Sequence, residues 1–232
     1  VKMREKESGR IFILAKARLA ANFKEAEVLE VFKGKALKGL FYKPLFNYFV
    51  ESQDDKSFQV LVDEFVTIED GTGVVHMAPA FGEADFFVCR REGIEPVCPV
   101  DQNGKFTSEV PDFEGSYVKD ADKEIIRRLK SEGRVVFHGQ IHHRYPFCWR
   151  SDTPLIYKAV STWFVAVEKI KDKLMRANEE IRWVPGHIKE GRFGKWLENA
   201  RDWAISRNRY WGCPIPLWRS DDGEIVVISS VR

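Results

Sequence analysis

The side chains best suited to chemistry lie in one stretch, residues 71–85, which reads Gly-Thr-Gly-Val-Val-His-Met-Ala-Pro-Ala-Phe-Gly-Glu-Ala-Asp. It places one imidazole, that of His76, and one carboxylate, that of Asp85, around a glycine-rich bend. A carboxylate holds a cationic amino group through charge-assisted hydrogen bonds, and glycines let a ligand approach the backbone closely. The stretch therefore indicates a site for a ligand that carries an amino group.

Four short elements are expected to position these two side chains: a tight turn, a strand, a second turn and the start of a helix. Gly71 and Gly73 permit positive φ angles in the first turn. Residues 74–75 are two valines, which favour a strand. Gly82 is expected to open a helix that has Asp85 in its first turn, where the helix dipole favours acidic residues.

The rest of the chain supplies the framework for this stretch. Many strands with a few peripheral helices predict an α+β fold, with a barrel-like mixed β domain at residues 1–142 and a more helical segment at 143–232. The boundary rests on a change in composition, because all seven tryptophans follow residue 148. Strands are predicted at 10–15, 28–32, 40–42, 58–68, 96–100 and 134–141, and helices at 83–92 and 119–132, with glycine caps at 93 and 133. In the second segment, residues 164–178 have an amphipathic pattern, and residues 187–204 alternate basic and aromatic residues.

The composition is that of an ordinary globular protein. Hydrophobic residues make up 44% of the 232 residues, and the net charge of +2 alone does not indicate a nucleic-acid-binding protein. The four cysteines form no CxxC pair, which argues against a disulfide framework and favours a reducing, cytoplasmic location. No apolar run reaches membrane-spanning length, so no membrane partner is expected. The chain begins with Val1 rather than Met, and we expect it to be part of a longer protein.

Three long blocks resemble one known family. Residues 71–85 resemble the editing-site signature of the class I isoleucyl-tRNA synthetases. Residues 143–157, which contain His-Arg-Tyr-Pro-Phe-Cys-Trp-Arg-Ser-Asp-Thr-Pro, resemble the segment that follows the editing core in this family. Residues 183–218, which contain Ala-Arg-Asp-Trp-Ala-Ile-Ser-Arg-Asn-Arg-Tyr-Trp-Gly, resemble the return toward the catalytic domain. The blocks stand in the same order as in the family and span residues 10–228, a much more specific signal than one short motif.

The resemblance implies a post-transfer editing domain, which hydrolyses valine wrongly esterified to tRNA(Ile). It also implies a parent enzyme that ligates isoleucine to tRNA(Ile) with ATP and Mg²⁺, with no cofactor held by this part. The expected partners are the 3′ acceptor end of tRNA(Ile) carrying valine and the rest of the synthetase chain. Two alternatives stay open: the editing domain of a valyl or leucyl relative, and a non-catalytic insert that docks tRNA.

The resemblance also assigns roles to residues. Asp85 would hold the α-ammonium group of the misattached amino acid, although a helix-dipole aspartate would also explain it. His76 would line the pocket, with a purely structural histidine as the alternative. The turn at 71–73 would present backbone N–H groups and a hydroxyl to the terminal ribose or the ester oxygen, or it is a plain turn. The expected substrate-binding residues are Gly71, Thr72, Gly73, His76, Ala78 and Phe81.

Other features are expected to contribute less. The weaker tRNA-contact candidates are Arg192, Lys195, Arg207 and Arg209, whereas most tryptophans nearby are expected to pack against the catalytic domain. Relatives often carry a second cysteine where Ser151 stands, so we predict no zinc beside Cys148. The threonine-rich strand that forms a second wall of the family's pocket would precede Val1. The His-Ile-Gly-His and Lys-Met-Ser-Lys-Ser signatures of the ATP site are absent from the sequence.

Overall fold

The structure is a computed structural model that describes residues 1–53, 55–207, 212 and 214–230. By its internal contacts the chain divides into two compact units, Val1–Ala159 and Val160–Arg232. Within the described residues no helix is long and apolar enough to cross a membrane.

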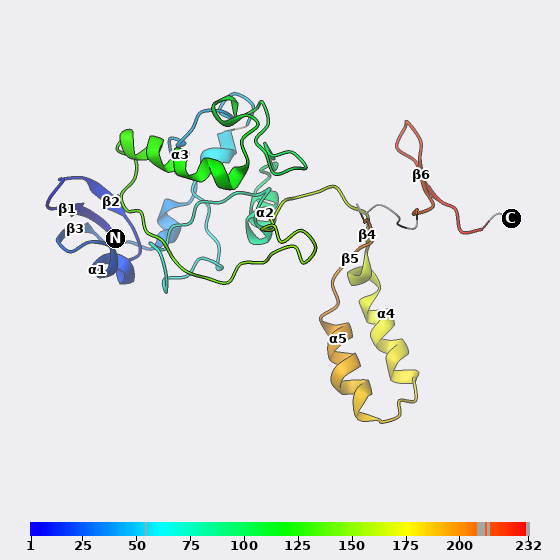
Figure 1. Ribbon diagram of the computed structural model, residues 1–232. Helices are drawn as coiled ribbons and strands as arrows, with labels where there is room; N and C mark the ends of the chain where they lie inside the picture. The colour runs from blue at the N-terminus through cyan, green and yellow to red at the C-terminus, as the bar shows by residue number, and fades with distance from the viewer. Residues whose placement is uncertain (54, 208–211, 213, 231–232) are drawn as a thin grey trace. The chain divides into compact units, whose positions relative to one another are not determined.

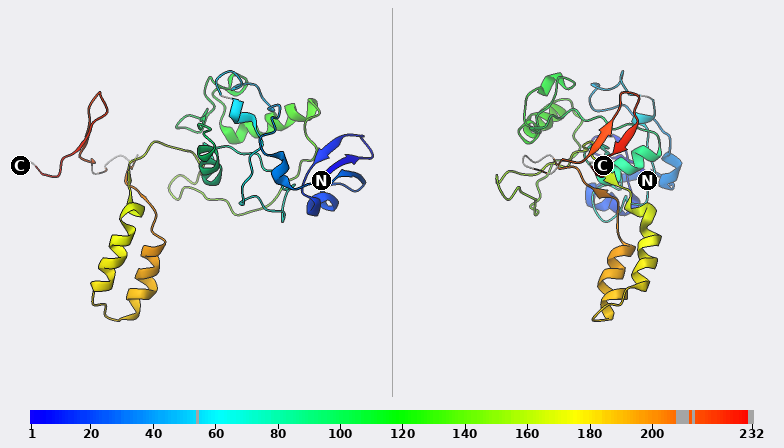
Figure 2. Two further views of the ribbon diagram at one scale, coloured as in Figure 1. Left: turned by 180° about the vertical axis from the view of Figure 1, so that it is seen from behind. Right: turned by 90° about the vertical axis from the view of Figure 1, so that its right-hand side faces the viewer.

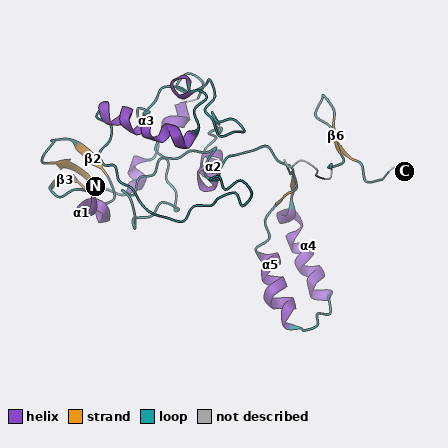
Figure 3. Ribbon diagram, viewed as in Figure 1, coloured by secondary structure: helices purple, strands orange, loops and turns teal. Residues whose placement is uncertain are grey.

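In the first unit, the described residues form a three-stranded sheet and three α-helices. Their arrangement can be followed in Figure 1. Loops predominate elsewhere in this unit, and they are drawn in teal in Figure 3. The α-helices and strands are β1 (Lys2–Glu5), β2 (Ile11–Ile13), α1 (Leu19–Asn22), β3 (Ala26–Glu30), α2 (Glu83–Arg91) and α3 (Val118–Ser131). The short 3-10 turns are η1 (Lys16–Arg18), η2 (Gly34–Leu37), η3 (Asp55–Phe58) and η4 (Pro111–Phe113).

The N-terminal sheet has the antiparallel order β2-β1-β3, so β1 is its central strand. Met3 pairs with Phe12 on one side and with Val28 on the other, and its side chain is fully buried. Met3 forms a core cluster with two other buried residues, Val1 and Leu14. The apolar side chains packed around this cluster are Phe12, Leu19, Phe23 and Ala26. Two of them flank or belong to α1, so the cluster fixes this short helix against the sheet.

A second core cluster lies beneath α3. Val110, Phe113 and Ala121 are buried together, with Phe106 and Ile125 packed against them. Because α3 has a polar outer side and an apolar inner side, its burial on this cluster accounts for a helix of this length.

The two helices predicted in this unit are confirmed together with their caps. The helix α2 ends where Gly93 takes a φ of 77°, and α3 ends where Gly133 takes a φ of 67°. At the end of α3 the N–H of Arg134 donates to Leu129 O over 2.9 Å, and the N–H of Gly133 donates to Lys130 O over 3.0 Å. These two bonds define a Schellman cap, which requires the positive φ that glycine allows.

Several predicted strands are wrong in extent. The strand at 10–15 shortens to β2 and that at 28–32 shifts to β3, whereas 134–141 and the valines at 74–75 form no strand. Segments 40–42 and 58–68 do meet, because the N–H of Tyr42 donates to Phe58 O over 2.9 Å, but only Phe41 and Gln59 form a bridge. The segment 96–100 likewise has one bridge, at Val100. Strand propensity describes side chains that fit a half-buried sheet surface, and without a partner strand the ladder does not extend.

The second unit consists of a helical hairpin and two small sheets. Its elements are β4 (Phe164–Val165), α4 (Val167–Glu180), the π-helical turn η5 (Lys189–Phe193), α5 (Gly194–Glu198), β5 (Trp203–Ala204), β6 (Leu217–Arg219) and β7 (Ile225–Val227). Figure 2 shows α4 and α5 side by side, and β4 pairs with β5 at the open end of the hairpin. The Trp183 indole N–H donates to Asn178 Oδ1 over 2.8 Å. Asn178 is the buried polar residue among the described residues of the hairpin. Helix was expected at 164–178 and is confirmed in α4, with a two-residue strand before it.

The fold class is confirmed as mixed α+β. The barrel-like form is not confirmed, because the strands of the described residues make one sheet of three strands and two sheets of two strands, with no closed barrel. The functional division at residues 142–143 stays a prediction.

The burial of Met3 leads to a prediction about stability. Met3→Ala should lower the free energy of unfolding of the first unit by about 2–5 kcal/mol, because it leaves a cavity at the centre of the sheet. As a control, Ile11→Ala on the neighbouring strand should cost about 1 kcal/mol or less, since Ile11 is 50% exposed. Urea unfolding measures both, and equal losses would contradict the position of the core.

Candidate functional site

The turn at residues 71–73 has the backbone that its glycines predict. Gly71 has a φ of 61° and Gly73 a φ of 74°, both in the region that favours glycine. Gly73 also packs closely against another part of the chain, because a Cβ placed on it would lie 2.5 Å from Ala15 Cβ. The Ala15 N–H donates to Thr72 O over 2.8 Å. The turn is therefore docked on the segment that follows β2.

Two side chains from η1 and α1 bind the carbonyl groups of the same turn. The Arg18 guanidinium donates from Nε to Gly71 O over 3.0 Å and from Nη1 to Glu69 O over 2.8 Å. Asn22 Nδ2 also donates to Gly71 O over 3.0 Å. Sequence analysis missed both residues, since neither belongs to a motif and both lie about fifty positions before the turn.

The amide groups of the turn point the other way. In a planar trans peptide the C=O of one residue and the N–H of the next are directed oppositely, so the N–H groups of Asp70, Thr72 and Gly73 face away from Arg18 and Ala15. No hydrogen-bond partner for these three N–H groups is present among the described residues. Unpaired backbone N–H groups of this kind can bind an anion or a carbonyl oxygen.

The Thr72 hydroxyl has local partners instead. It donates to Val74 O over 3.1 Å and accepts from the Val74 N–H over 3.3 Å. These bonds stabilise the exit from the turn.

Asp85 lies in the first turn of α2, and its side chain binds the backbone of the loop that precedes this helix. Its Oδ2 accepts a hydrogen bond from the Ala78 N–H over 2.9 Å. Gly82, which precedes α2, leaves room for this carboxylate, because a Cβ there would lie 2.8 Å from Asp85 Oδ2. Within residues 78–85, the Phe81 N–H donates to Ala78 O over 2.8 Å. The helix start and the loop before it therefore form one rigid unit.

A carboxylate in this position keeps capacity for a ligand. Two oxygens offer about four acceptor positions, and one bond is made to Oδ2 in the described part of the chain. The side chain is half-buried, which strengthens an interaction with a cation over one at a fully exposed site.

His76 lies apart from this carboxylate. It is exposed within the extended segment 74–77, and no hydrogen bond or ring contact joins it to Asp85 among the described residues. Ala78 and Phe81 are half-buried, and Ala80 between them is buried and accepts from the Ala159 N–H over 2.7 Å. The structure thus bonds Ala78 to Asp85 and Phe81 to Ala78, whereas among the described residues no hydrogen bond joins His76 or residues 71–73 to that carboxylate.

Cys89, one turn after Asp85, does not qualify as a nucleophile. Burial raises the pKa of its thiol, and the negative charge of Asp85 raises it further. A thiol held protonated in this way is chemically inert at neutral pH. Its burial on the inner side of α2 makes it a packing residue.

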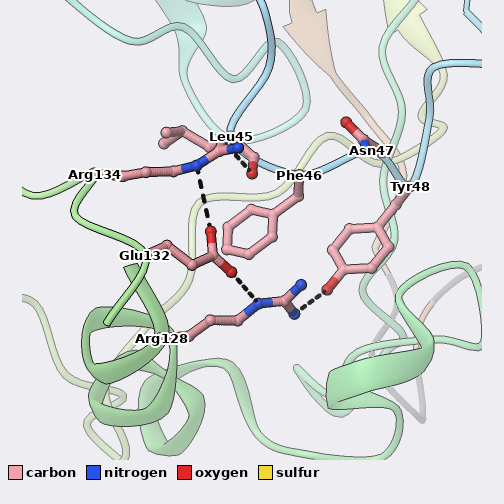
Figure 4. A pocket seen from close by; sticks show the side chains of 7 residues that line it. All are labelled: Leu45, Phe46, Asn47, Tyr48, Arg128, Glu132 and Arg134. Carbon is pink, nitrogen blue, oxygen red and sulfur yellow. Dashed lines mark hydrogen bonds and ion pairs between the residues drawn. The ribbon is translucent and has the colours of Figure 1, made fainter. Parts of the chain in front are cut away.

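A hollow of about 600 Å³ lies elsewhere in the first unit, between the loop at 45–48 and the end of α3 (Figure 4). It is lined by Leu45, Phe46, Asn47, Tyr48, Arg128, Glu132 and Arg134. None of the predicted site residues lines it. Its charged groups bind one another, because Glu132 accepts from Arg128 Nε over 3.0 Å and pairs with Arg134 Nε over 3.3 Å. Arg134 Nη1 also donates to Leu45 O over 2.9 Å. These bonds therefore join the loop at 45–48 to the end of α3.

Asp112 completes this junction. Its Oδ2 accepts from the Tyr48 hydroxyl over 2.6 Å and from Arg128 Nη1 over 2.6 Å. The bond from Tyr48 and then the charge-assisted bond from Arg128 lower the pKa of the Asp112 carboxyl. Burial and the neighbouring carboxylate raise the pKa of Tyr48. Sequence analysis missed the cluster because its members are 16 to 80 positions apart.

The weaker candidates for RNA contact lie in the second unit. Arg192 and Lys195 are exposed on η5 and α5. Arg207 is exposed too, and its Nη1 donates to Ala204 O over 2.8 Å. Arg209 lies outside the described residues. In the part of the chain that is described, no three His, Cys, Asp or Glu residues come together as a metal site. The absence of zinc beside Cys148 stays a prediction.

Comparison with known proteins identifies the relatives of this chain. Residues 14–232 match the family described as tRNA synthetases class I (I, L, M and V). The whole chain is 59% identical to the isoleucine–tRNA ligase of Chlamydia pneumoniae and 58% identical to that of Chlamydia muridarum. The matched part is 22% of the first relative and 23% of the second, so the chain spans less than a quarter of their length. The resemblance to the isoleucine enzymes is thus confirmed at the level of the sequence.

The close packing of Gly73 predicts a pairwise effect with Ala15. Gly73→Ala should cost more stability than Gly71→Ala: both add the strain of positive φ, about 1–2 kcal/mol, but only Gly73 meets Ala15. In the double variant Gly73→Ala with Ala15→Gly, part of the loss should return, with a coupling of about 0.5–3 kcal/mol. Thermal unfolding of the unmodified protein, of the single variants Gly73→Ala and Ala15→Gly and of the double variant measures this coupling. A coupling of zero would show that the turn is not docked on Ala15.

The lowered pKa of Asp112 predicts how stability changes in acid. A carboxyl whose folded pKa lies below its ordinary value of 3.8 adds stability above that value and loses it as the pH falls through the folded pKa. The first unit should therefore lose more stability than its Asp112→Asn variant between about pH 5 and pH 2. Tyr48→Phe removes the largest cause and should raise the pKa of Asp112, as read by NMR titration. Parallel acid profiles for the protein and Asp112→Asn would contradict the cluster.

Proposed function

Because the chain belongs to the class I tRNA synthetases, we propose that it contains the post-transfer editing site of an isoleucyl-tRNA synthetase. The site hydrolyses the ester that joins valine to tRNA(Ile). Two candidate recognition elements within residues 70–85 support this proposal. One is the row of unpaired N–H groups at 70–73, and the other is the half-buried carboxylate of Asp85.

A synthetase for isoleucine needs such a site for a physical reason. Valine lacks one methylene of isoleucine, and a pocket that accepts the larger side chain excludes the smaller one by only about 1–3 kcal/mol, a range measured on isoleucine enzymes themselves. A second, smaller pocket that admits valine and rejects isoleucine corrects the remaining errors. The proposed substrate is therefore the 3′ acceptor end of tRNA(Ile) that carries valine.

Each group of the site has a role in this reaction. Asp85 binds the α-ammonium group of valine and fixes the ester for attack. The N–H groups of the turn receive the ester oxygen or the terminal ribose, and they stabilise negative charge as it develops. A water oxygen adds to the ester carbonyl carbon, the carbon–oxygen bond to the ribose breaks, and the ribose oxygen takes a proton. His76, Ala78 and Phe81 line the amino-acid subsite.

The alternative for Asp85 is a stabilising aspartate at a helix start. The bond from the Ala78 N–H fits either role, since it both anchors the loop and orients the carboxylate. What favours the editing role is the position of the residue at the end of the fifteen-residue signature shared with the isoleucine enzymes. A helix dipole accounts for the acidic residues at the start of α2 but not for the turn and the extended segment at residues 71–81.

The wider assignments belong to the same proposal. Residues 1–142 form the editing domain with its barrel-like form, and residues 143–232 lead back toward the catalytic domain. ATP and Mg²⁺ serve the parent enzyme, which acts in the cytoplasm, and are not bound by this part. Arg192, Lys195, Arg207 and Arg209 are the proposed tRNA contacts of the second segment. A valyl or leucyl relative is the second candidate, and a preference for threonyl-tRNA(Val) over valyl-tRNA(Ile) would favour it.

The test is deacylation of valyl-tRNA(Ile) by the complete gene product. Asp85→Asn keeps an acceptor for the Ala78 N–H but removes the charge, so it should slow deacylation about 10- to 100-fold while the protein stays folded. Asp120→Asn is the matched control, because Asp120 lies in the first turn of α3 and is exposed. Its deacylation rate should equal that of the unmodified protein.

Two outcomes would contradict the proposal in different ways. Deacylation no faster than in buffer would rule out a hydrolase and leave the tRNA-docking insert. Equal rates for Asp85→Asn and the unmodified protein would leave the hydrolase but remove the role of Asp85.

A further inference from the structure

We propose that Arg18 and Asn22 are positioning residues of the editing site. They hold the turn at residues 69–73 so that its N–H groups face the substrate. This role rests on the function proposed above and adds residues that lie outside the editing signature. Neither side chain is placed in contact with substrate, so neither is a catalytic residue.

The contacts fix the directions of three carbonyl groups, those of Glu69, Gly71 and Thr72. Arg18 spans the turn, with one bond of 2.8 Å to Glu69 O and another of 3.0 Å to Gly71 O. Asn22 adds a second bond of 3.0 Å to Gly71 O, and the Ala15 N–H holds Thr72 O at 2.8 Å. The peptide groups after residues 69, 71 and 72 are thereby all held from the same side.

Fixing the carbonyls fixes the donors. Each of these peptide groups has its N–H on the opposite side, on Asp70, Thr72 and Gly73 respectively. With a positive φ at both Gly71 and Gly73, the turn has freedom to rotate its peptide planes unless something holds them. Arg18 and Asn22 therefore preorganise the donors, and preorganisation is what makes such donors effective at a developing negative charge.

The charge of Arg18 strengthens the same donors. A carbonyl that accepts a hydrogen bond from a cation is polarised, and the N–H of that peptide group becomes a better donor. Arg18 is half-buried, so water screens its charge less than at an open surface. No carboxylate pairs with Arg18 in the described part of the chain, so its full charge acts on the turn.

The base of this arrangement is rigid. Arg18 ends η1 and Asn22 ends α1, and between them Leu19 packs against the buried cluster of Val1, Met3 and Leu14. Asn22 Nδ2 also donates to Arg18 O over 2.8 Å, which joins the two residues. The core of the N-terminal sheet thus fixes the position of the N–H donors of the turn.

The experiment compares four variants of the complete gene product in deacylation of valyl-tRNA(Ile). Arg18→Gln removes the charge and the two-pronged contact, Arg18→Lys keeps the charge with one contact, and Asn22→Ala removes the second bond to Gly71. Lys16→Ala is the control, because Lys16 is exposed on η1 and, among the described residues, its side chain forms no hydrogen bond or ion pair with the turn. Melting temperature confirms folding for each variant.

A positioning role predicts a split between the kinetic constants. Arg18→Gln should lower kcat about 10- to 100-fold with KM changed less than about threefold, whereas Arg18→Lys and Asn22→Ala should lose less and Lys16→Ala nothing. The amide NMR signals of Thr72 and Gly73 should move in Arg18→Gln and stay in place in Lys16→Ala. A purely structural role would lower the melting temperature without this split.

The outcomes separate this inference from the proposed function. If the unmodified protein deacylates valyl-tRNA(Ile) and Arg18→Gln does so equally well, the inference is wrong and the function stands. If the unmodified protein has no deacylase activity, the function fails and the positioning role fails with it. If kcat stays constant while only stability falls, Arg18 is structural and the inference is overturned.

Discussion

The proposed site depends on the fixed direction of the peptide groups between Glu69 and Gly73. A trans peptide cannot turn its carbonyl one way without turning the next N–H the other way. Hydrogen bonds from Arg18, Asn22 and Ala15 hold the carbonyls on one side. The donors on the other side are then available without any reorganisation when negative charge develops. The core of the N-terminal sheet, which includes Leu14, supports the segment that orders this turn with its two glycines.

Asp85, at the other end of the signature, is likewise held by a hydrogen bond to the backbone. One oxygen anchors the loop through Ala78, and the carboxylate keeps further acceptor positions for a cation. Gly82 is required there because a side chain would occupy the space of the carboxylate. In the proposed function, structure and recognition are therefore combined in one residue. This combination explains why a helix-start aspartate and a ligand-binding aspartate look alike when the sequence is considered alone.

Features that depend on interactions between residues close in sequence could be predicted, whereas features that depend on distant residues could not. The helices α2 and α3 and their caps at Gly93 and Gly133 could be predicted, because caps and helical periodicity are local. The strand at 74–75 could not, since two valines show a preference but not whether a partner strand exists. Arg18 and the cluster of Tyr48, Asp112 and Arg128 were beyond reach for a related reason, because their partners lie 16 to 80 positions away. The family resemblance identified the candidate site, and only coordinates identified what holds it.

The central claim is that the turn and Asp85 receive one aminoacyl ester together. A crystal structure of the complete gene product with a non-hydrolysable valyl-adenosine analogue tests this most directly. The account predicts that the α-ammonium group binds the Asp85 carboxylate and that an oxygen next to the ribose accepts hydrogen bonds from the N–H groups of residues 70–73. Density for the analogue elsewhere, for example in the hollow beside Arg128, with residues 70–85 empty, would contradict it.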